Sequence, residues 1–179
     1  MSLLSRYKSL ALPPLMATLL AFGACSAGQP PAPPLPDRAP APVFTAADAG
    51  FAQKLNDMNI RQITLARLAQ THAARSDIAT QAATIVKDLT GNQARLAALM
   101  TAHAITLPTE PSSADRKTID RMRKLHGPAF DRGYMRVLSR DRAGMTPVIQ
   151  DALARSRNPD LTKLAIDTKT MLAAYQAQL

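Results

Sequence analysis

Apolar side chains recur at every third or fourth position through most of the chain after Phe44, a spacing that predicts amphipathic helices. The pattern marks four long helical segments, over about residues 46–73, 77–104, 128–156 and 159–178. A shorter segment, 114–125, lies in the connection between the second and the third. No alternating strand pattern and no Asn-Gly or Asp-Gly hairpin signal is present. The pattern therefore predicts an all-α up-down four-helix bundle with a short extra helix in the connection between helices two and three.

Capping residues agree with these segments. The expected N-terminal residues are Thr45 with Asp48, Ser76, Ser113, Pro128 after Gly127, and Asn158 before Pro159. Helix-forming residues are plentiful, whereas tryptophan is absent and aromatic residues make up only 4% of the chain. The 136 or so residues from 44 to 179 are enough for one domain with a sizeable core.

The first 24 residues follow a different pattern. Arg6 and Lys8 precede the apolar run Leu10–Phe22, and the small residues Gly23 and Ala24 follow it. A short basic segment, an apolar run too short to span a bilayer comfortably and small residues at the end are typical of a secretory signal peptide, here residues 1–24.

Cys25, the only cysteine, comes directly after this segment. Its position resembles the bacterial lipobox, in which the cysteine becomes the lipidated first residue of the mature protein. The lipobox usually has Leu where this chain has Phe22, so cleavage by the ordinary signal peptidase is the alternative. A single cysteine excludes an intramolecular disulfide. Ser26 follows Cys25, and the resemblance to bacterial lipoproteins then implies the periplasmic face of the outer membrane rather than the inner membrane.

Residues 25–43 are rich in proline and alanine and have no apolar periodicity. Such a composition favours extended, semi-rigid chain, so the segment is predicted to be a disordered tether between the lipid anchor and the helical domain, residues 44–179. The alternative interpretation is a proline-rich ligand for a partner domain.

The helical domain resembles a bacterial envelope family, domain of unknown function 4142. The resemblance rests on Phe130-Asp131-Arg132-Gly133-Tyr134, which is similar to the Phe-Asp-x-x-Tyr signature of that family, and on Ile105-Thr106-Leu107-Pro108, which resembles its turn after helix two. It implies a ferritin-like fold and a secreted or lipid-anchored protein. The family has no assigned molecular function, so the resemblance implies no activity.

The chain departs from that family where relatives carry carboxylates and histidines. The corresponding positions here are Gln62, Asp88 with Leu89, Arg142 and Tyr175. Ferritin-like proteins hold metal ions with inward-facing carboxylates and histidines, and the residues present here are poor or repelling ligands. The resemblance therefore implies a degenerate site, without a metal or other cofactor. We expect Arg142 to pair with Asp88 or Asp57, or else to reach solvent.

Charge is the remaining signal. The net charge is +9, and removal of Arg6 and Lys8 with the leader lowers it to +7. Arg132, Arg136 and Arg140 are spaced by four and share one helix face, which could bind anionic lipid or lipopolysaccharide, or could simply be solvated. Nucleic acid is a poor candidate, because few aromatic residues accompany the basic ones.

No catalytic motif is recognisable, and Asp131 is interpreted as support for the N-terminus of the third long helix rather than as a catalytic acid. The sequence thus predicts a non-enzymatic, lipid-anchored periplasmic helical bundle with a role in envelope interaction or stress. The alternatives are a metal-handling ferritin-like protein and a module that binds anionic envelope lipids. An envelope protein is a further candidate partner.

Overall fold

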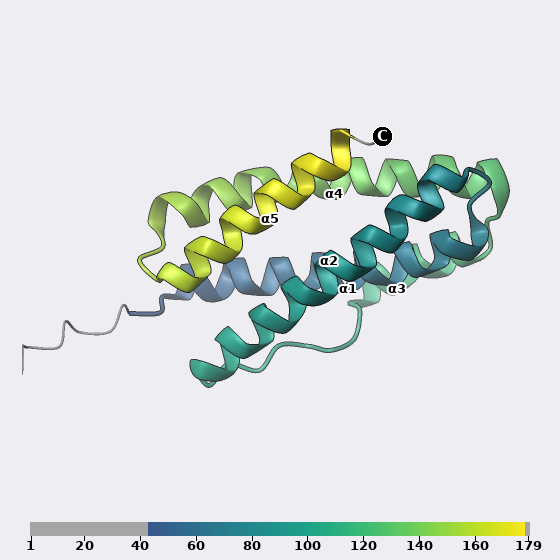
Figure 1. The fold of residues 1–179 in the computed structure, drawn as a ribbon. Coiled ribbons are helices and arrows are strands. Elements are labelled where there is room, and N and C mark those ends of the chain that lie inside the picture. The colour runs from purple at the N-terminus through teal and green to yellow at the C-terminus, as the bar shows by residue number, and fades with distance from the viewer. Residues whose placement is uncertain (1–42, 178–179) are drawn as a thin grey trace, which may run out of the picture. The chain divides into compact units, whose positions relative to one another are not determined.

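The structure is a computed structural model that describes residues 43–177. These residues form five helices and no strand: α1 (Ala46–His72), α2 (Ser76–Ala102), α3 (Ser113–Arg123), α4 (Gly127–Arg155) and α5 (Pro159–Ala177). The predicted all-α helical bundle is confirmed (Figure 1). The predicted signal peptide, Cys25 and almost all of the predicted tether lie outside the described residues.

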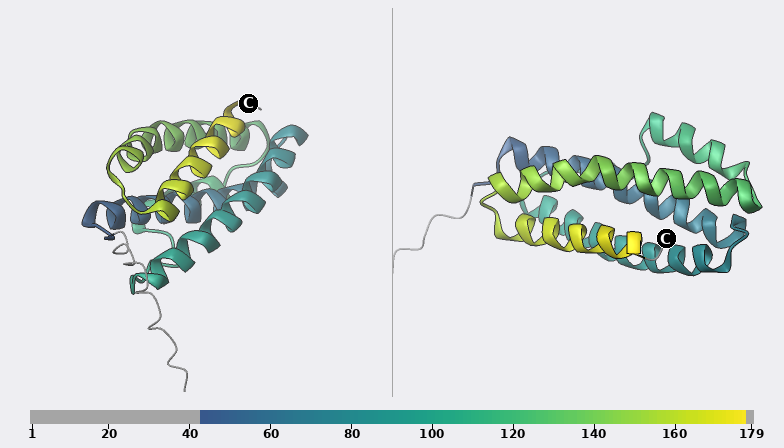
Figure 2. Two further views of the ribbon diagram at one scale, coloured as in Figure 1. Left: turned by 60° about the vertical axis from the view of Figure 1, so that its left-hand side comes forward. Right: turned by 90° about the horizontal axis from the view of Figure 1, so that it is seen from above.

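The four long helices form a closed bundle in which α1 and α5 each pack against α2 and α4. Two antiparallel hairpins, α1–α2 and α4–α5, make up the bundle (Figures 1 and 2). The connection that contains α3 returns along the length of the bundle, so α2 and α4 start at the same end (Figure 1). One long crossover of this kind is typical of ferritin-like bundles. Because of it, the helices do not alternate in direction throughout, as the predicted up-down order would require (Figure 1).

The helix ends follow from local capping. Thr45 caps α1: its Oγ1 accepts the Asp48 N–H at 3.1 Å, and the Asp48 carboxylate accepts the Thr45 N–H at 2.8 Å. Asn158 caps α5 by accepting the Leu161 N–H at 3.0 Å, as predicted. Two caps lie one residue earlier than predicted, because Arg75 precedes α2 and Ser112 caps α3 through the Asp115 N–H.

Asp131 does not support its own helix, which corrects the sequence-based interpretation. Its carboxylate accepts the backbone N–H groups of Ala74 and Arg75, at 3.1 and 3.3 Å, just before α2. The reason is topological. Because α2 and α4 start at the same end of the bundle (Figure 1), a side chain near the start of α4 reaches the backbone that precedes α2.

The core consists mainly of Leu, Ile, Met and Ala side chains, with the rings of Phe130 and Tyr134 fully buried on α4. Pro147 lies inside α4, which nevertheless continues as one helix to Arg155. Among residues 43–177, no helix combines the length and the apolar character that a membrane span requires.

Candidate functional site

A cavity of about 270 Å³ lies between the four long helices, and each of them contributes to its wall. Its main lining residues are Gln62 of α1, Leu89 of α2, Met135, Leu138, Asp141 and Arg142 of α4, and Leu172 and Tyr175 of α5. The wall is thus mostly apolar, with a few polar groups. We refer to this space as the bundle cavity.

The structure brings together the positions that the resemblance predicted to be a degenerate ligand set. Gln62, Leu89, Arg142 and Tyr175 all line the bundle cavity, and the Tyr175 hydroxyl donates to the Asp88 carboxylate at 3.3 Å. The donor set does not suit a metal ion, because an amide, a leucine and a guanidinium stand where ligands would be needed. Within residues 43–177, no group of three or more His, Cys, Asp or Glu side chains could hold a metal.

The paired cation of this region is Arg61, which is largely but not fully buried. The expected pairing of Arg142 with Asp88 or Asp57 is not observed. Arg61 Nε donates to Asp141 at 2.9 Å and Arg61 Nη1 to Asp115 at 2.5 Å. Gln62 Nε2 also donates to the Asp141 carboxylate. Arg142 forms no ion pair within the described range, either with Asp88 or with Asp57.

In the Arg61 network one guanidinium pairs with two carboxylates, so the three ionised groups together carry a net charge of −1. Burial alone would lower the pKa of Arg61, but the hydrogen bonds and charges of Asp141 and Asp115 outweigh it and raise that pKa. Both carboxylates are less than a tenth exposed, so each needs the guanidinium as a counter-charge.

Two tyrosine hydroxyls lie near the cavity in different environments. Burial, together with the Asp88 charge, raises the pKa of Tyr175 well above its ordinary value. Burial alone raises the pKa of Tyr134, whose hydroxyl has no hydrogen-bond partner in the structure. The Oε1 atom of Gln62 is also buried without a partner.

Sequence reasoning missed a layer of buried amides next to the cavity. Asn59 Nδ2 donates to Asn92 Oδ1 at 2.9 Å, and Asn92 Nδ2 donates to Thr168 Oγ1 at 3.1 Å, so the layer links α1, α2 and α5. All three residues are fully buried. The sequence does carry a signal for this layer. Three amide side chains recur every third position beside the apolar stripe of α1: Asn56, Asn59 and Gln62.

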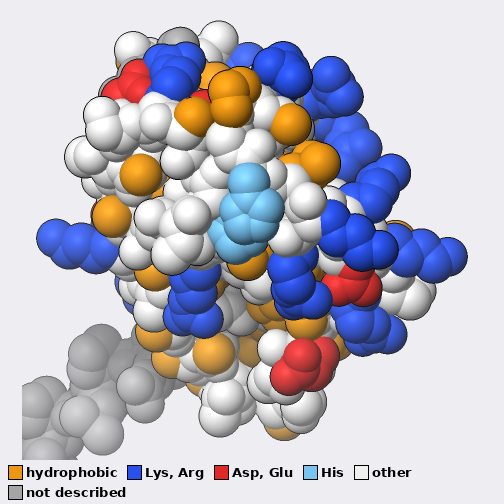
Figure 3. Space-filling model, turned by 90° about the vertical axis from the view of Figure 1, so that its right-hand side faces the viewer, with side chains coloured by type: hydrophobic (Ala, Val, Ile, Leu, Met, Phe, Trp, Pro, Cys, Tyr) orange, Lys and Arg blue, Asp and Glu red, His pale blue; other side chains and the backbone are white. Residues whose placement is uncertain are grey.

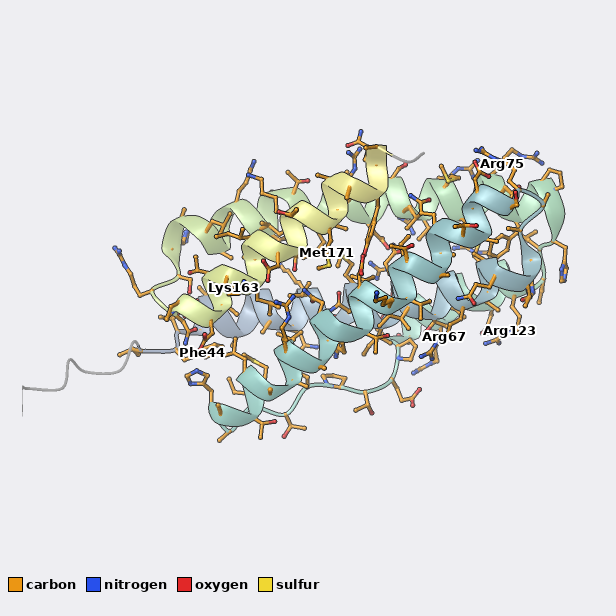
Figure 4. All side chains as sticks on the ribbon, viewed as in Figure 1. Phe44, Arg67, Arg75, Arg123, Lys163 and Met171 are labelled. Atoms are coloured by element: carbon orange, nitrogen blue, oxygen red, sulfur yellow. The ribbon has the colours of Figure 1, made fainter. Side chains whose placement is uncertain are left out.

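The predicted basic face lies on the outside of α4. Arg132, Arg136 and Arg140 are exposed and form no ion pair with another described residue. The start of α4 joins other basic residues at one end of the bundle, where Lys and Arg side chains surround a histidine surface and few acidic groups are visible (Figure 3). Arg67, Arg75 and Arg123 project at this end from three different elements, and Phe44 lies at the opposite end (Figure 4).

We define the basic end by its exposed cations, which are Arg67, Arg75, Arg121, Arg123, Lys124, Arg132 and Arg136. The carboxylates near them are already in use. Asp77 pairs with Arg75, Asp120 pairs with Arg123, and Asp131 accepts the backbone N–H groups of Ala74 and Arg75. The remaining cations have no acidic partner within residues 43–177.

Two details of the basic end were not predictable from sequence spacing. The rings of His72 and His126, 54 positions apart, stack with centroids 4.1 Å apart. An open hollow of about 580 Å³ is lined by Arg75, Arg132 and Arg136 together with the apolar side chains of Ile78 and Met135. The hollow therefore combines two cations of α4 and one that precedes α2 with an apolar surface, and the Asp131 carboxylate also lines it.

The comparisons with known proteins identify the class. The family model of domain of unknown function DUF4142 matches residues 33–179, so the chain belongs to this family. The fold is similar to the crystal structure of the DUF305 protein from Streptomyces coelicolor, with a TM-score of 0.62 and 12% identity over 75% of this chain and 88% of that one. No curated protein matches the chain significantly.

Proposed function

We propose that the protein is a non-enzymatic, extracytoplasmic binding module, anchored by lipid on Cys25, whose basic end binds anionic lipid head groups. One observation carries this proposal. Several exposed cations at one end of the bundle have no acidic partner among the described residues, while the nearby carboxylates are engaged elsewhere. Unpaired surface cations of this kind attract an anionic membrane surface.

The hollow at the basic end favours a lipid over a free small anion as the ligand. Arg75, Arg132 and Arg136 would contact phosphate groups, and the partly buried Met135 would contact the apolar region beneath them. An extracytoplasmic location is supported by the signal-peptide pattern, and the similar DUF305 protein is itself described as secreted.

The chain enters the bundle at the end opposite to the basic end (Figure 4). Phe44 and the basic end are therefore separated by the length of α1, which at 27 residues is about 40 Å. Eighteen residues lie between Cys25 and Phe44, and a chain of that length can reach at most about 55 Å, which exceeds the length of α1 and is compatible with contact between the basic end and a membrane.

Vesicle binding tests the proposal on the chain from Ser26 onward, which lacks the lipid but keeps the core from Phe51 to Tyr175. It should sediment with phosphatidylcholine vesicles that contain phosphatidylglycerol, and not with phosphatidylcholine alone. Each cation near the surface contributes about 1 kcal/mol, so the triple variant R67Q/R132Q/R136Q should bind about 100-fold more weakly.

A matched control removes three exposed, unpaired cations elsewhere, in the variant K54Q/K87Q/R157Q. Its net charge equals that of the first variant, so an equal loss of binding would mean that total charge, not the basic end, decides. Binding to neither vesicle would refute the proposal.

Lipidation needs a separate test, because Cys25 lies outside the described residues. A clickable palmitate analogue should label the full-length chain in a bacterial host, and the Cys25→Ala variant should remain unlabelled. Equal labelling of both would remove the lipid anchor and leave the vesicle result unaffected.

A further inference from the structure

We propose that the bundle cavity is a binding site for a small organic monoanion, of the class of medium-chain or aromatic carboxylates, and that Arg142 binds the carboxylate. This site is separate from the basic end. It is built between the four helices, and its arginine is not one of the cations that define the basic end.

The size and the wall of the cavity indicate the ligand's apolar part. Leu89, Leu138 and Leu172 line the cavity, and Met135, whose side chain adapts to different shapes, completes the apolar surface. A protein cavity of about 150 Å³ accommodates benzene. In proportion, the bundle cavity, at about 270 Å³, accommodates a molecule of about ten non-hydrogen atoms.

The charges on the wall indicate the ligand's polar part. Asp141 already pairs with Arg61 and accepts a hydrogen bond from Gln62, so its carboxylate has its partners within the protein. Arg142 is half-buried and has no acidic partner among residues 43–177. A single half-buried guanidinium suits one bidentate carboxylate.

A neighbouring carboxylate favours a monoanion over a phosphate dianion. Asp88 lies just behind Tyr175 and would repel additional negative charge. A smaller cavity of about 180 Å³ continues along α4 and α5 and shares Arg142 and Leu172 with the first. Arg142 therefore stands where the two spaces meet, so a carboxylate bound to it can place its apolar body in the larger cavity.

Calorimetric titration of the chain from Ser26 onward with octanoate tests this inference. Octanoate has ten non-hydrogen atoms and one negative charge, and we expect saturable binding with one site per chain. The neutral 1-octanol should bind at least tenfold more weakly, because it cannot pair with the guanidinium. Absence of octanoate binding, or equal affinity for both probes, would overturn the proposal.

Three variants separate the site from non-specific binding. Arg142→Gln should lower octanoate affinity at least tenfold but change 1-octanol affinity little. Leu172→Phe should weaken both probes, since the larger ring fills the cavity. Arg140→Gln removes the same charge from an exposed position outside the cavity wall and should leave both affinities unchanged. An octanoate affinity equally reduced by R140Q and R142Q, or unaffected by R142Q and L172F, would also contradict the assignment.

Discussion

At the scale of single residues, Arg61 is the cation on which two buried carboxylates depend. Asp115 and Asp141 are both less than a tenth exposed, and Arg61 bonds to each of them. Arg142, by contrast, is half-buried and has no ion pair in the described chain. The two arginines should therefore contribute very differently to stability.

Arg61→Ala should lower the free energy of unfolding by about 3 kcal/mol, because it leaves two buried carboxylates without a counter-charge. Arg142→Ala should change it by less than about 0.5 kcal/mol, as is usual for an unpaired residue near the surface. Urea denaturation at pH 7 measures both variants. Similar losses of stability for the two variants would show that Arg61 is not the essential counter-charge of Asp115 and Asp141.

The buried hydroxyl of Tyr134 leads to a second prediction. It has no hydrogen-bond partner in the structure, and burial raises its pKa well above the ordinary value. Tyr134→Phe should therefore leave stability at pH 7 unchanged or raise it by about 1 kcal/mol. Tyr175→Phe, which loses the hydrogen bond to Asp88, is the comparison and should lower stability slightly.

The pKa of Tyr134 also sets the direction of a pH effect. Because the pKa of Tyr134 is higher in the folded than in the unfolded protein, its ionisation does not affect stability below the unfolded pKa of about 10. Above that pH the unfolded state releases the proton more readily, so the free energy of unfolding falls as the pH rises. The Phe variant lacks this loss, so its advantage over the wild type should grow between pH 8 and pH 10.5. An advantage that shrinks with pH would contradict the assignment.

At the scale of helices, the two parallel helix starts explain the role of Asp131. The crossover connection places the N-termini of α2 and α4 at one end, and Asp131 of α4 satisfies two backbone N–H groups before α2. Asp131 belongs to the Phe-Asp-x-x-Tyr signature, so this part of the signature has a structural use.

Asp131→Ala should cost about 1 kcal/mol, the usual loss for a removed helix cap. Amide hydrogen exchange should increase in the first turns of α2, and much less in the first turn of α4. Asp151→Ala removes a carboxylate from an exposed pair with Arg155 on the same helix, and should change stability by less than about 0.5 kcal/mol. Faster exchange confined to α4 would restore the original interpretation of Asp131.

The helices themselves were largely predictable from sequence. The apolar periodicity and the caps located each of the five helices to within about two residues, because these signals are local. The partners of Arg61 and Asp131 were not predictable. They depend on how α3 packs against α1 and on the common starting end of α2 and α4, and neither follows from a local pattern.

At the scale of the whole molecule, the resemblance to relatives located a site that spacing alone would have missed. One cavity is lined by residues from all four long helices that lie up to 113 positions apart in the sequence: Gln62, Leu89, Arg142 and Tyr175. The resemblance could not predict the ion pairs next to the cavity, since it involved neither Arg61 nor Asp141.

This convergence allows a final prediction about metal. In the wild type, the guanidinium of Arg142 repels a cation and Asp141 is occupied by Arg61 and Gln62. We therefore expect Co²⁺ to leave the Tm of the wild-type chain unchanged. Replacing four cavity residues by the family's carboxylate and histidines should create a site, in the variant with Gln62→Glu, Leu89→His, Arg142→His and Tyr175→His.

That variant should gain thermal stability on addition of Co²⁺, by about 2.7 kcal/mol when free metal exceeds Kd 100-fold. The control keeps Gln62→Glu but carries Ala at the other three positions, so it opens the cavity without adding imidazoles. Circular dichroism must first show that both variants are helical. A Co²⁺-dependent rise in the Tm of the wild type would refute the degenerate site. If the histidine variant folds and gains no more than its control, the four side chains do not converge closely enough to share one ion.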